Sequence, residues 1–464
     1  MLFPLNSKHT KRKKNGPLAL SPMLFMIGMF VLLSFICGGF SKVPLLIVFI
    51  TTSIFSLFTL RHTPFEERLT IYSRGAGQDN LLLMIWIFVL AGAFAATARQ
   101  MGAVDATVNL CLQLLPPSML LPGLFLASCF ISMSIGTSVG TIVALVPIAV
   151  GMAGPSGLTE PMMVASCVGG AFFGDTTVVA TRTQGVKMSD KFRTNFAVAL
   201  PAALLTFALY MYLGWGTTSH IAVGAVDYWK ILPYVVVIVT AILGLNVLIV
   251  LTGGILLTGI IGIWANSYDV AGWLSSICEG IGGMSELILI SMMAGGLLAV
   301  IRAGGGITWL IHNLTRQVKT VRGGELGIAT LVSLTNLCTA NNTVAILSVG
   351  PLAKAISQRF GVDPRRAASI LDTFSCVVQG IIPYGAQLLM AGGLASLAPT
   401  SIMPFLFYPY ILAFVMLMSI ALRRNKQVDD IEGHIFKSKI GSKKTVLSED
   451  KSKEKTFFLL FFIQ

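Results

Sequence analysis

The chain has 464 residues, of which 55% are hydrophobic and 11% are charged, and its mean hydropathy is +0.80. A soluble domain carries roughly 25% charged residues, so water cannot cover most of this chain's surface. The formal net charge of +13 would suit nucleic acid, but Lys and Arg lie between the apolar segments. That placement encodes membrane topology and argues against nucleic-acid binding.

The chain begins with a basic stretch, Met1 to Gly16, followed by an apolar run from Leu18 to Gly39. This run is longer than a typical signal peptide core and lacks an obvious cleavage site, so we expect a retained first helix with a cytoplasmic N-terminus. Runs of roughly 20 apolar residues predict membrane spans. They recur at about 18–39, 43–60, 80–98, 119–153, 161–181, 196–214, 231–251, 253–266, 284–301, 326–353, 367–395 and 404–422.

These segments predict an all-α, polytopic integral membrane protein of about 10–12 transmembrane helices. We divide the chain into a cytoplasmic basic N-terminus (1–17), N-terminal helices (18–78), a first transport repeat (79–214), linker helices (215–283), a second transport repeat (284–422) and a cytoplasmic tail (423–464).

An internal repeat supports this division. Ala91-Gly92 and Arg99 recur 203 residues later as Ala294-Gly295 and Arg302, and Pro161 recurs at the same offset as Pro364. Repeats of this length are typical of transporters built from two related halves, although chance similarity between apolar segments is an alternative.

The distribution of basic residues predicts that the two halves are inverted. Segment 182–195 is basic (Arg182, Lys187, Lys191, Arg193), whereas 154–160 has no Lys or Arg; in the second half, 354–366 is basic and about 386–398 is not. By the positive-inside rule, the halves have opposite orientations. Segments 119–153 and 326–353 then have both ends on one side, and each is a re-entrant hairpin or a broken helix.

Two pairs of polar or glycine-rich breaks interrupt the apolar segments at equivalent places in the halves. Gly136–Thr141 pairs with Thr339–Thr343, and Gly174–Thr177 pairs with Gln379–Gly385. Hydroxyls, amides and freed carbonyls are the oxygen ligands that sodium needs, and half-helix ends supply partial charges. The alternatives are helix–helix hydrogen bonding for Ser and Thr, and close packing for glycines spaced as GxxxG.

Asp175 and Asp372 are carboxylates inside apolar segments. Burying a carboxylate costs several kcal/mol, so such a residue is a functional candidate by default. A proton or a sodium ion relieves this cost, and competition for one group is the simplest mechanism of antiport. The alternative is a structural carboxyl that is neutralised by hydrogen bonds or by Arg182.

The sequence does not predict an enzyme. Gly136–Gly140 matches the hydrolase pattern GxSxG, but that motif needs a strand-to-helix turn and a triad that the sequence does not supply. No phosphate-binding P-loop is present, which argues against ATP-driven transport.

Five motifs resemble the NhaC-type Na⁺/H⁺ antiporter family over roughly residues 20 to 422. They are FVLAGAFAATARQMGAVD (88–105), GTSVGTIVALVPIAVG (136–151), ATRTQGVKMSDKFRTNF (180–196), TNLCTANNTV (335–344) and LDTFSCVVQGIIPYGAQLLM (371–390). The resemblance implies the ion-transporter-superfamily fold with inverted repeats and cation exchange against protons. The chain departs from the family pattern GDNLSxISDTT at Gly174–Thr177, where a short stretch containing one of two aspartates is missing.

We therefore predict a secondary active transporter that exchanges Na⁺ for H⁺ by alternating access in the bacterial inner membrane, with both termini cytoplasmic. The predicted ion site comprises Asp175, Thr176, Thr177, Thr137, Ser138, Asn341, Asn342 and Asp372. No cofactor is expected; the partners are membrane lipid, sodium ions and protons, and a homodimer is left open. The alternatives are a Na⁺- or H⁺-coupled carrier of a small carboxylate or amino acid, and a transport-inactive membrane protein.

Overall fold

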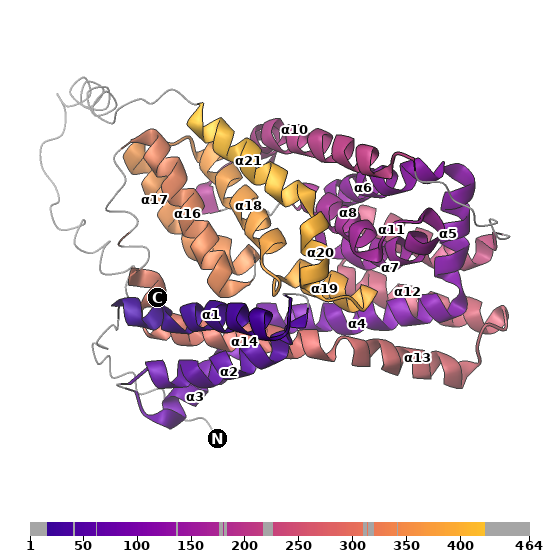
Figure 1. Cartoon of the computed structure of the whole chain (residues 1–464), viewed down its shortest axis with the longest axis horizontal. Coiled ribbons are helices and arrows are strands. Elements are labelled where there is room, and N and C mark those ends of the chain that lie inside the picture. Colours follow the sequence, from indigo (N-terminus) through magenta and orange to yellow (C-terminus); the bar gives the residue numbers. More distant parts are fainter. Residues whose placement is uncertain are drawn as a thin grey trace, which may run out of the picture.

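The computed structural model of the chain describes residues 16–39, 42–61, 63–135, 138–175, 180, 183–216, 226–309, 313, 320–340 and 342–422, and they form a helical assembly (Figure 1). Eight of the described helices are long and apolar enough to cross a membrane, or up to nine if the bent pair Pro399–Phe405 and Phe407–Ala421 is one span. Four shorter apolar helices accompany them. The predicted all-α polytopic membrane fold is confirmed.

The first half contains η1 (Gly16–Leu20), α1 (Ser21–Ile36), α2 (Leu45–Thr59), α3 (Phe65–Ala76), α4 (Asp79–Met101), α5 (Ala103–Leu114), α6 (Pro117–Ile135), α7 (Ser138–Ser156), α8 (Glu160–Phe173) and α10 (Met188–Gly214). The second half contains α11 (Tyr228–Ile242), α12 (Val247–Trp264), α13 (Val270–Gly283), α14 (Ser285–Ala303), α16 (Val321–Thr339), α17 (Asn342–Phe360), α18 (Pro364–Ile381), α19 (Ala386–Ala395), α20 (Pro399–Ile402), η3 (Met403–Phe405) and α21 (Phe407–Ala421).

All four predicted breaks interrupt the helices. Segment 119–153 divides into α6 and α7, and segment 326–353 divides into α16 and α17, with each pair of helices packed together. Ala340 ends α16 with a φ of 49°, a left-handed conformation that a residue with a side chain seldom adopts. Helix α8 ends at Phe173, with Gly174 as its C-cap, and α18 and α19 flank residues 382–385.

The helix bounds reproduce the repeat. Helices α6, α7 and α8 begin 204 residues before α16, α17 and α18, respectively. A hydrogen bond recurs at the same offset: Ser132 Oγ donates to the carbonyl of Ala171, and Asn336 Nδ2 donates to the carbonyl of Ser375 over 2.8 Å. Each bond ties the first helix of a hairpin to the helix that follows the hairpin.

Close helix crossings extend this correspondence to α3 and α13. A Cβ atom on Gly92 of α4 would lie 2.3 Å from the carbonyl oxygen of Gly280 in α13, and one on Gly75 of α3 would lie 2.6 Å from that of Gly295 in α14. Only glycine permits such contact between two helix backbones. Gly92 and Gly295 are the repeat-related glycines, so each half lays its short helix against the long helix of the other half.

The molecule has two parts that differ in their helices (Figure 1). Helices α1–α4, α13 and α14 lie side by side in a layer, which we call the platform. The interrupted helices α6–α8 and α16–α19 lie together against this layer, and we call them the broken-helix unit. Helices α10 and α21 pack on the broken-helix unit.

The structure corrects several predicted boundaries. Segment 231–251 ends as α11 at Ile242, because Asn246 caps the next helix by accepting a hydrogen bond from the Leu248 N–H over 2.9 Å. Helices α3, α5 and α13 were not predicted, since their glycines and polar residues dilute the apolar signal. Helix α10 begins at Met188, so Lys191 and Arg193 of the basic segment 182–195 lie in a helix.

Candidate functional site

The centre of the broken-helix unit is a buried carboxylate at the end of α8. Asp175 follows the helix by two residues and is 8% exposed, while Ser138, the first residue of α7, is 1% exposed. The Ser138 hydroxyl donates a hydrogen bond to Asp175 Oδ2 over 2.9 Å. The carboxylate therefore faces the N-terminus of α7, where the helix dipole favours negative charge.

A side chain from the second half completes this contact. Gln387, the second residue of α19, places Nε2 3.4 Å from Asp175 Oδ2 and 3.2 Å from Ser138 Oγ. Its amide oxygen is buried and has no hydrogen-bond partner among the described residues, and the same holds for the hydroxyl of Thr141, one turn further along α7. We define Asp175, Ser138 and Gln387 as the carboxylate cluster.

Asn342 reaches the same region through a chain of contacts. Its Nδ2 lies 3.9 Å from the Sγ atom of Cys376, and that thiol lies 3.8 Å from the backbone oxygen of Asp175. Ser375 Oγ donates to Asn342 Oδ1, and Asn336 Nδ2 contacts Ser375 Oγ over 3.2 Å. The N-terminus of α17 and the middle of α18 are thereby connected to the end of α8.

The two halves thus bring polar interruptions together at a carboxylate. Of the predicted ion-site residues, Asp175 and Ser138 are in direct contact, and Asn342 is connected to them through Cys376. Thr137, Thr176, Thr177 and Asn341 lie outside the described residues. Their predicted roles stay predictions.

Asp372 has a different environment. Its Oδ2 lies 2.6 Å from the Nζ atom of Lys191, and the two side chains are only 2% and 1% exposed. Beside this pair, the amide oxygen of Asn195 accepts hydrogen bonds from Ser369 (3.0 Å) and Thr373 (3.3 Å). These contacts of Lys191 and Asn195 with Asp372, Ser369 and Thr373, which we call the polar seam, join α10 of the first half to α18 of the second.

Sequence reasoning missed Gln387, Cys376 and Lys191. Gln387 is the single polar side chain in the helix sequence AQLLMAGGLA, directly after a break, and that isolation was a usable signal. Cys376 is one turn after Asp372 on the same helix face. This spacing would have indicated that Cys376 lies near the site only if Asp372 had first been placed there. Nothing in the sequence indicated that Lys191 is buried, because it lies between Lys187 and Arg193 in a basic segment of the kind that is common on the cytoplasmic side of a membrane.

The sequence contains two GxxxG motifs, Gly136–Gly140 and Gly170–Gly174, and both glycines of the second motif serve close packing. A Cβ atom on Gly174 would lie 2.1 Å from the nitrogen of Met133, and one on Gly170 would lie 2.5 Å from the oxygen of Phe125. Both contacts are to α6. Helix α8 therefore lies directly against α6, which fixes the position of Asp175.

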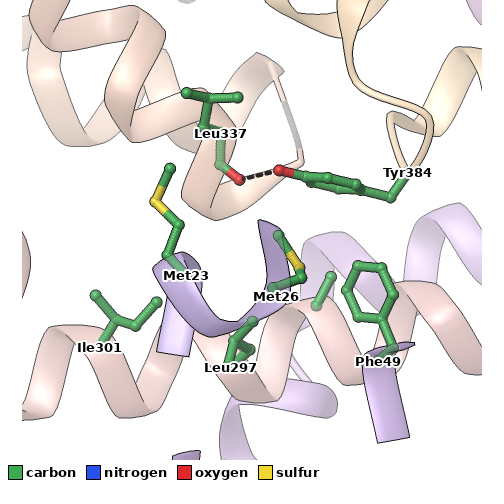
Figure 2. Close-up of a pocket in the computed structure, with 8 residues that line it drawn as sticks. Met23, Met26, Phe49, Leu297, Ile301, Leu337 and Tyr384 are labelled. Atoms are coloured by element: carbon green, nitrogen blue, oxygen red, sulfur yellow. Dashed lines mark hydrogen bonds between the residues drawn. The ribbon is translucent and has the colours of Figure 1, made fainter. Parts of the chain in front are cut away.

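A small cavity lies between the platform and the broken-helix unit (Figure 2). Tyr384, at the break between α18 and α19, donates from its hydroxyl to the carbonyl of Leu337 over 2.8 Å, near the end of α16. The lining is otherwise apolar: Met23, Met26, Phe49, Ala294, Leu297 and Ile301. This composition suits an interface between helices and does not suit binding of an ion.

The chain is similar to known proteins over most of its length. The sequence pattern described as "Na+/H+ antiporter family" matches residues 16–215 and 217–423. The chain is similar to the Na(+)/H(+) antiporter NhaC of Bacillus subtilis, with 21% identity over 454 residues, 88% of this chain and 98% of the relative. It is similar to the malate-2H(+)/Na(+)-lactate antiporter of the same organism, with 22% identity over 378 residues, 72% of this chain and 80% of the relative.

Among solved structures, the chain is similar to the YdaH transporter of Alcanivorax borkumensis. The match has 13% sequence identity and a TM-score of 0.38, and it covers 87% of this chain and 97% of that one.

Proposed function

The chain belongs to the Na⁺/H⁺ antiporter family and exchanges sodium ions for protons across a membrane, and we propose that the carboxylate cluster is where the two ions compete. The observation that carries this proposal is the buried contact between Asp175 and Ser138, 2.9 Å apart at the junction of two helix ends. Asp175 supplies the charge, and Ser138 and Gln387 supply oxygen atoms.

Competition at Asp175 follows from its burial. An ionised carboxylate that has left water is costly unless a positive charge accompanies it. A sodium ion can take ligands from the carboxylate, the Ser138 hydroxyl and the Gln387 amide oxygen, which lacks a partner among the described residues. A proton on the carboxyl removes the charge, and the sodium site with it. The two states exclude each other, and this exclusion couples sodium movement to proton movement.

Exchange requires that the cluster face one side of the membrane at a time. In the proposal, the broken-helix unit moves against the platform and carries Asp175 with it, loaded with sodium in one direction and with a proton in the other. We also propose that the membrane is the bacterial inner membrane and that both termini are cytoplasmic; the basic segments before the first helix and after the last support this orientation.

The test is proteoliposomes that contain a pH-sensitive dye. Addition of sodium to one side should change the internal pH, and Asp175→Asn should abolish that change because amide nitrogen cannot carry the charge. Asp79→Asn is the matched control, since Asp79 is an exposed aspartate at the start of α4, and it should retain exchange. Sodium-driven proton flux that survives in Asp175→Asn would refute the assignment.

A second candidate is exchange that involves an organic acid, which the similarity to the malate-2H(+)/Na(+)-lactate antiporter favours. The same vesicles distinguish the two functions. Pure Na⁺/H⁺ exchange proceeds with sodium alone, whereas the second candidate requires lactate or malate on one side before the dye responds.

A further inference from the structure

The buried pair Lys191–Asp372 stands beside the carboxylate cluster and is not used by the exchange described above. Lys191 lies in the first turn of α10, in the first half of the chain, and Asp372 lies in the middle of α18, in the second half. Their charged atoms are 2.6 Å apart and both side chains are almost fully enclosed. A cation that belongs to the protein itself therefore occupies this second carboxylate.

The two carboxylates are close neighbours. Cys376, whose thiol contacts the backbone of Asp175 over 3.8 Å, is one helical turn after Asp372. One turn is a rise of about 6 Å, so Asp372 and Asp175 lie within a short distance of each other in a low-dielectric region. Two ionised carboxylates so placed require two positive charges, and Lys191 contributes one of them.

The lysine is also held in place by the structure around it. One turn further along α10, Asn195 accepts hydrogen bonds from Ser369 and Thr373, the two residues that flank Asp372 on the same side of α18. The seam fixes the register of α10 against α18. It keeps the ammonium group on Asp372 and away from Asp175, whose described side-chain contacts are Ser138 and Gln387.

We infer that Lys191 acts as a tethered substitute for a transported cation at Asp372, and so limits the protein to one exchangeable sodium ion, at Asp175. This inference rests on the proposed function of Asp175. In chemical terms, Asp372 is a second sodium site that an ammonium group of the chain already fills. Removal of the ammonium group should open that site to sodium.

The experiment counts bound ²²Na⁺ per purified protein by equilibrium binding at alkaline pH, where protons compete least. The unmodified protein should bind one sodium ion. Lys191→Met should bind two, because it removes the ammonium group that lies 2.6 Å from the carboxylate of Asp372. Lys191→Arg, which retains a cation, and Lys191→Met/Asp372→Asn, which removes both charges, should each bind one.

Two results would overturn the inference: two sodium ions on the unmodified protein, or fewer than two on a folded Lys191→Met. Folding is checked by size-exclusion chromatography. Where Lys191→Met is too unstable to purify, its thermal unfolding is followed in membrane extracts. Sodium, compared with choline, should raise its melting temperature more than it raises that of the double variant. Equal shifts would also count against the inference.

Asp175→Asn separates this inference from the proposed function. With Lys191 present, it should bind no sodium. If it still binds one ion, Asp175 is not the exchange site and the proposed function fails, whatever Lys191→Met shows. If it binds none and Lys191→Met still binds one, the proposed function stands and the role of Lys191 is refuted.

Discussion

The three side chains of the carboxylate cluster contribute differently to the proposed sodium site. Asp175 carries the charge, Ser138 donates to the charged oxygen over 2.9 Å, and Gln387 approaches both from the other half of the chain. A hydrogen bond to a charged group is worth roughly 1.5–3 kcal/mol, more than one between neutral groups. Each polar neighbour should therefore affect sodium affinity without being essential.

We expect Ser138→Ala and Gln387→Leu each to raise the half-saturating sodium concentration for exchange by roughly 10-fold or more, which corresponds to about 1.5 kcal/mol. The maximal rate should fall less than the affinity, because Asp175 remains. Sodium titrations of dye-loaded proteoliposomes measure both quantities. Ser166→Ala is the control: this buried hydroxyl donates to the carbonyl of Met163 in its own helix, and its removal should leave the titration unchanged.

The Lys191–Asp372 pair makes a separate prediction about stability. Removal of one member of a buried ion pair leaves an uncompensated charge and costs roughly 3–5 kcal/mol, whereas replacement of both by apolar residues of similar size is often neutral. Lys191→Met should therefore destabilise the protein far more than Lys191→Met/Asp372→Leu. Denaturant titration in mixed micelles without sodium gives both values, and equal losses in the two variants would contradict the pairing.

At the scale of elements, the position of Asp175 depends on how closely α8 lies against α6. Gly170 and Gly174 allow this approach, and no other residue type fits at either position without a shift of backbone. The consequence is rigidity where the ion binds: the end of α8 cannot tilt away from α6 without loss of the contact between their backbones.

Gly170→Ala should lower the free energy of unfolding by about 1–3 kcal/mol, because the added methyl would lie 2.5 Å from Phe125 O and from Ser128 Cβ. The control is Gly282→Ala in α13, where the structure leaves open space within 4 Å of the added atom. Alanine favours helix there and should be neutral or slightly stabilising. Thermal unfolding of the two variants side by side tests the difference.

The positions of the helix breaks could be predicted from the sequence. The side chains that contact the residues at or near these breaks could not. Glycine, proline and clustered polar residues interrupt an apolar helix for local reasons, so Gly174 and residues 382–385 were recognisable. The contacts of Asp175 with Gln387, 212 residues later, and of Lys191 with Asp372, 181 residues later, depend on how the helices pack. Local pattern carries no information about such pairings.

For the whole molecule, the cavity of Figure 2 lies where relative motion of the two parts would have to occur. Its walls are side chains of α1, α2 and α14 on the platform side and Leu337 and Tyr384 on the other side. Apolar side chains can slide past one another without breaking directional bonds. The hydroxyl of Tyr384 bonds to the Leu337 carbonyl within the broken-helix unit, and its ring packs edge to face against Phe49 of the platform, with 5.5 Å between ring centroids.

A covalent bridge across this cavity should stop exchange. The test uses a variant without other cysteines that carries Leu297→Cys in α14 and Leu337→Cys in α16. A short bismaleimide that joins these two cysteines should abolish sodium-driven proton flux while sodium binding persists. The matched control joins Met23→Cys to Leu297→Cys, which line the same cavity but both belong to the platform. Exchange that continues with the first bridge in place would mean that these two surfaces do not move apart during transport.

The glycine crossings of α4 with α13 and of α3 with α14 have a consequence for biosynthesis. Helix α4 enters the bilayer early, with Gly92 facing a partner that the ribosome has not yet made. Only after α13 is translated and inserted does Gly280 close that contact, and α3 likewise waits for α14. Both contacts between the halves therefore form only after the second half has been translated, so the first half cannot complete its packing on its own.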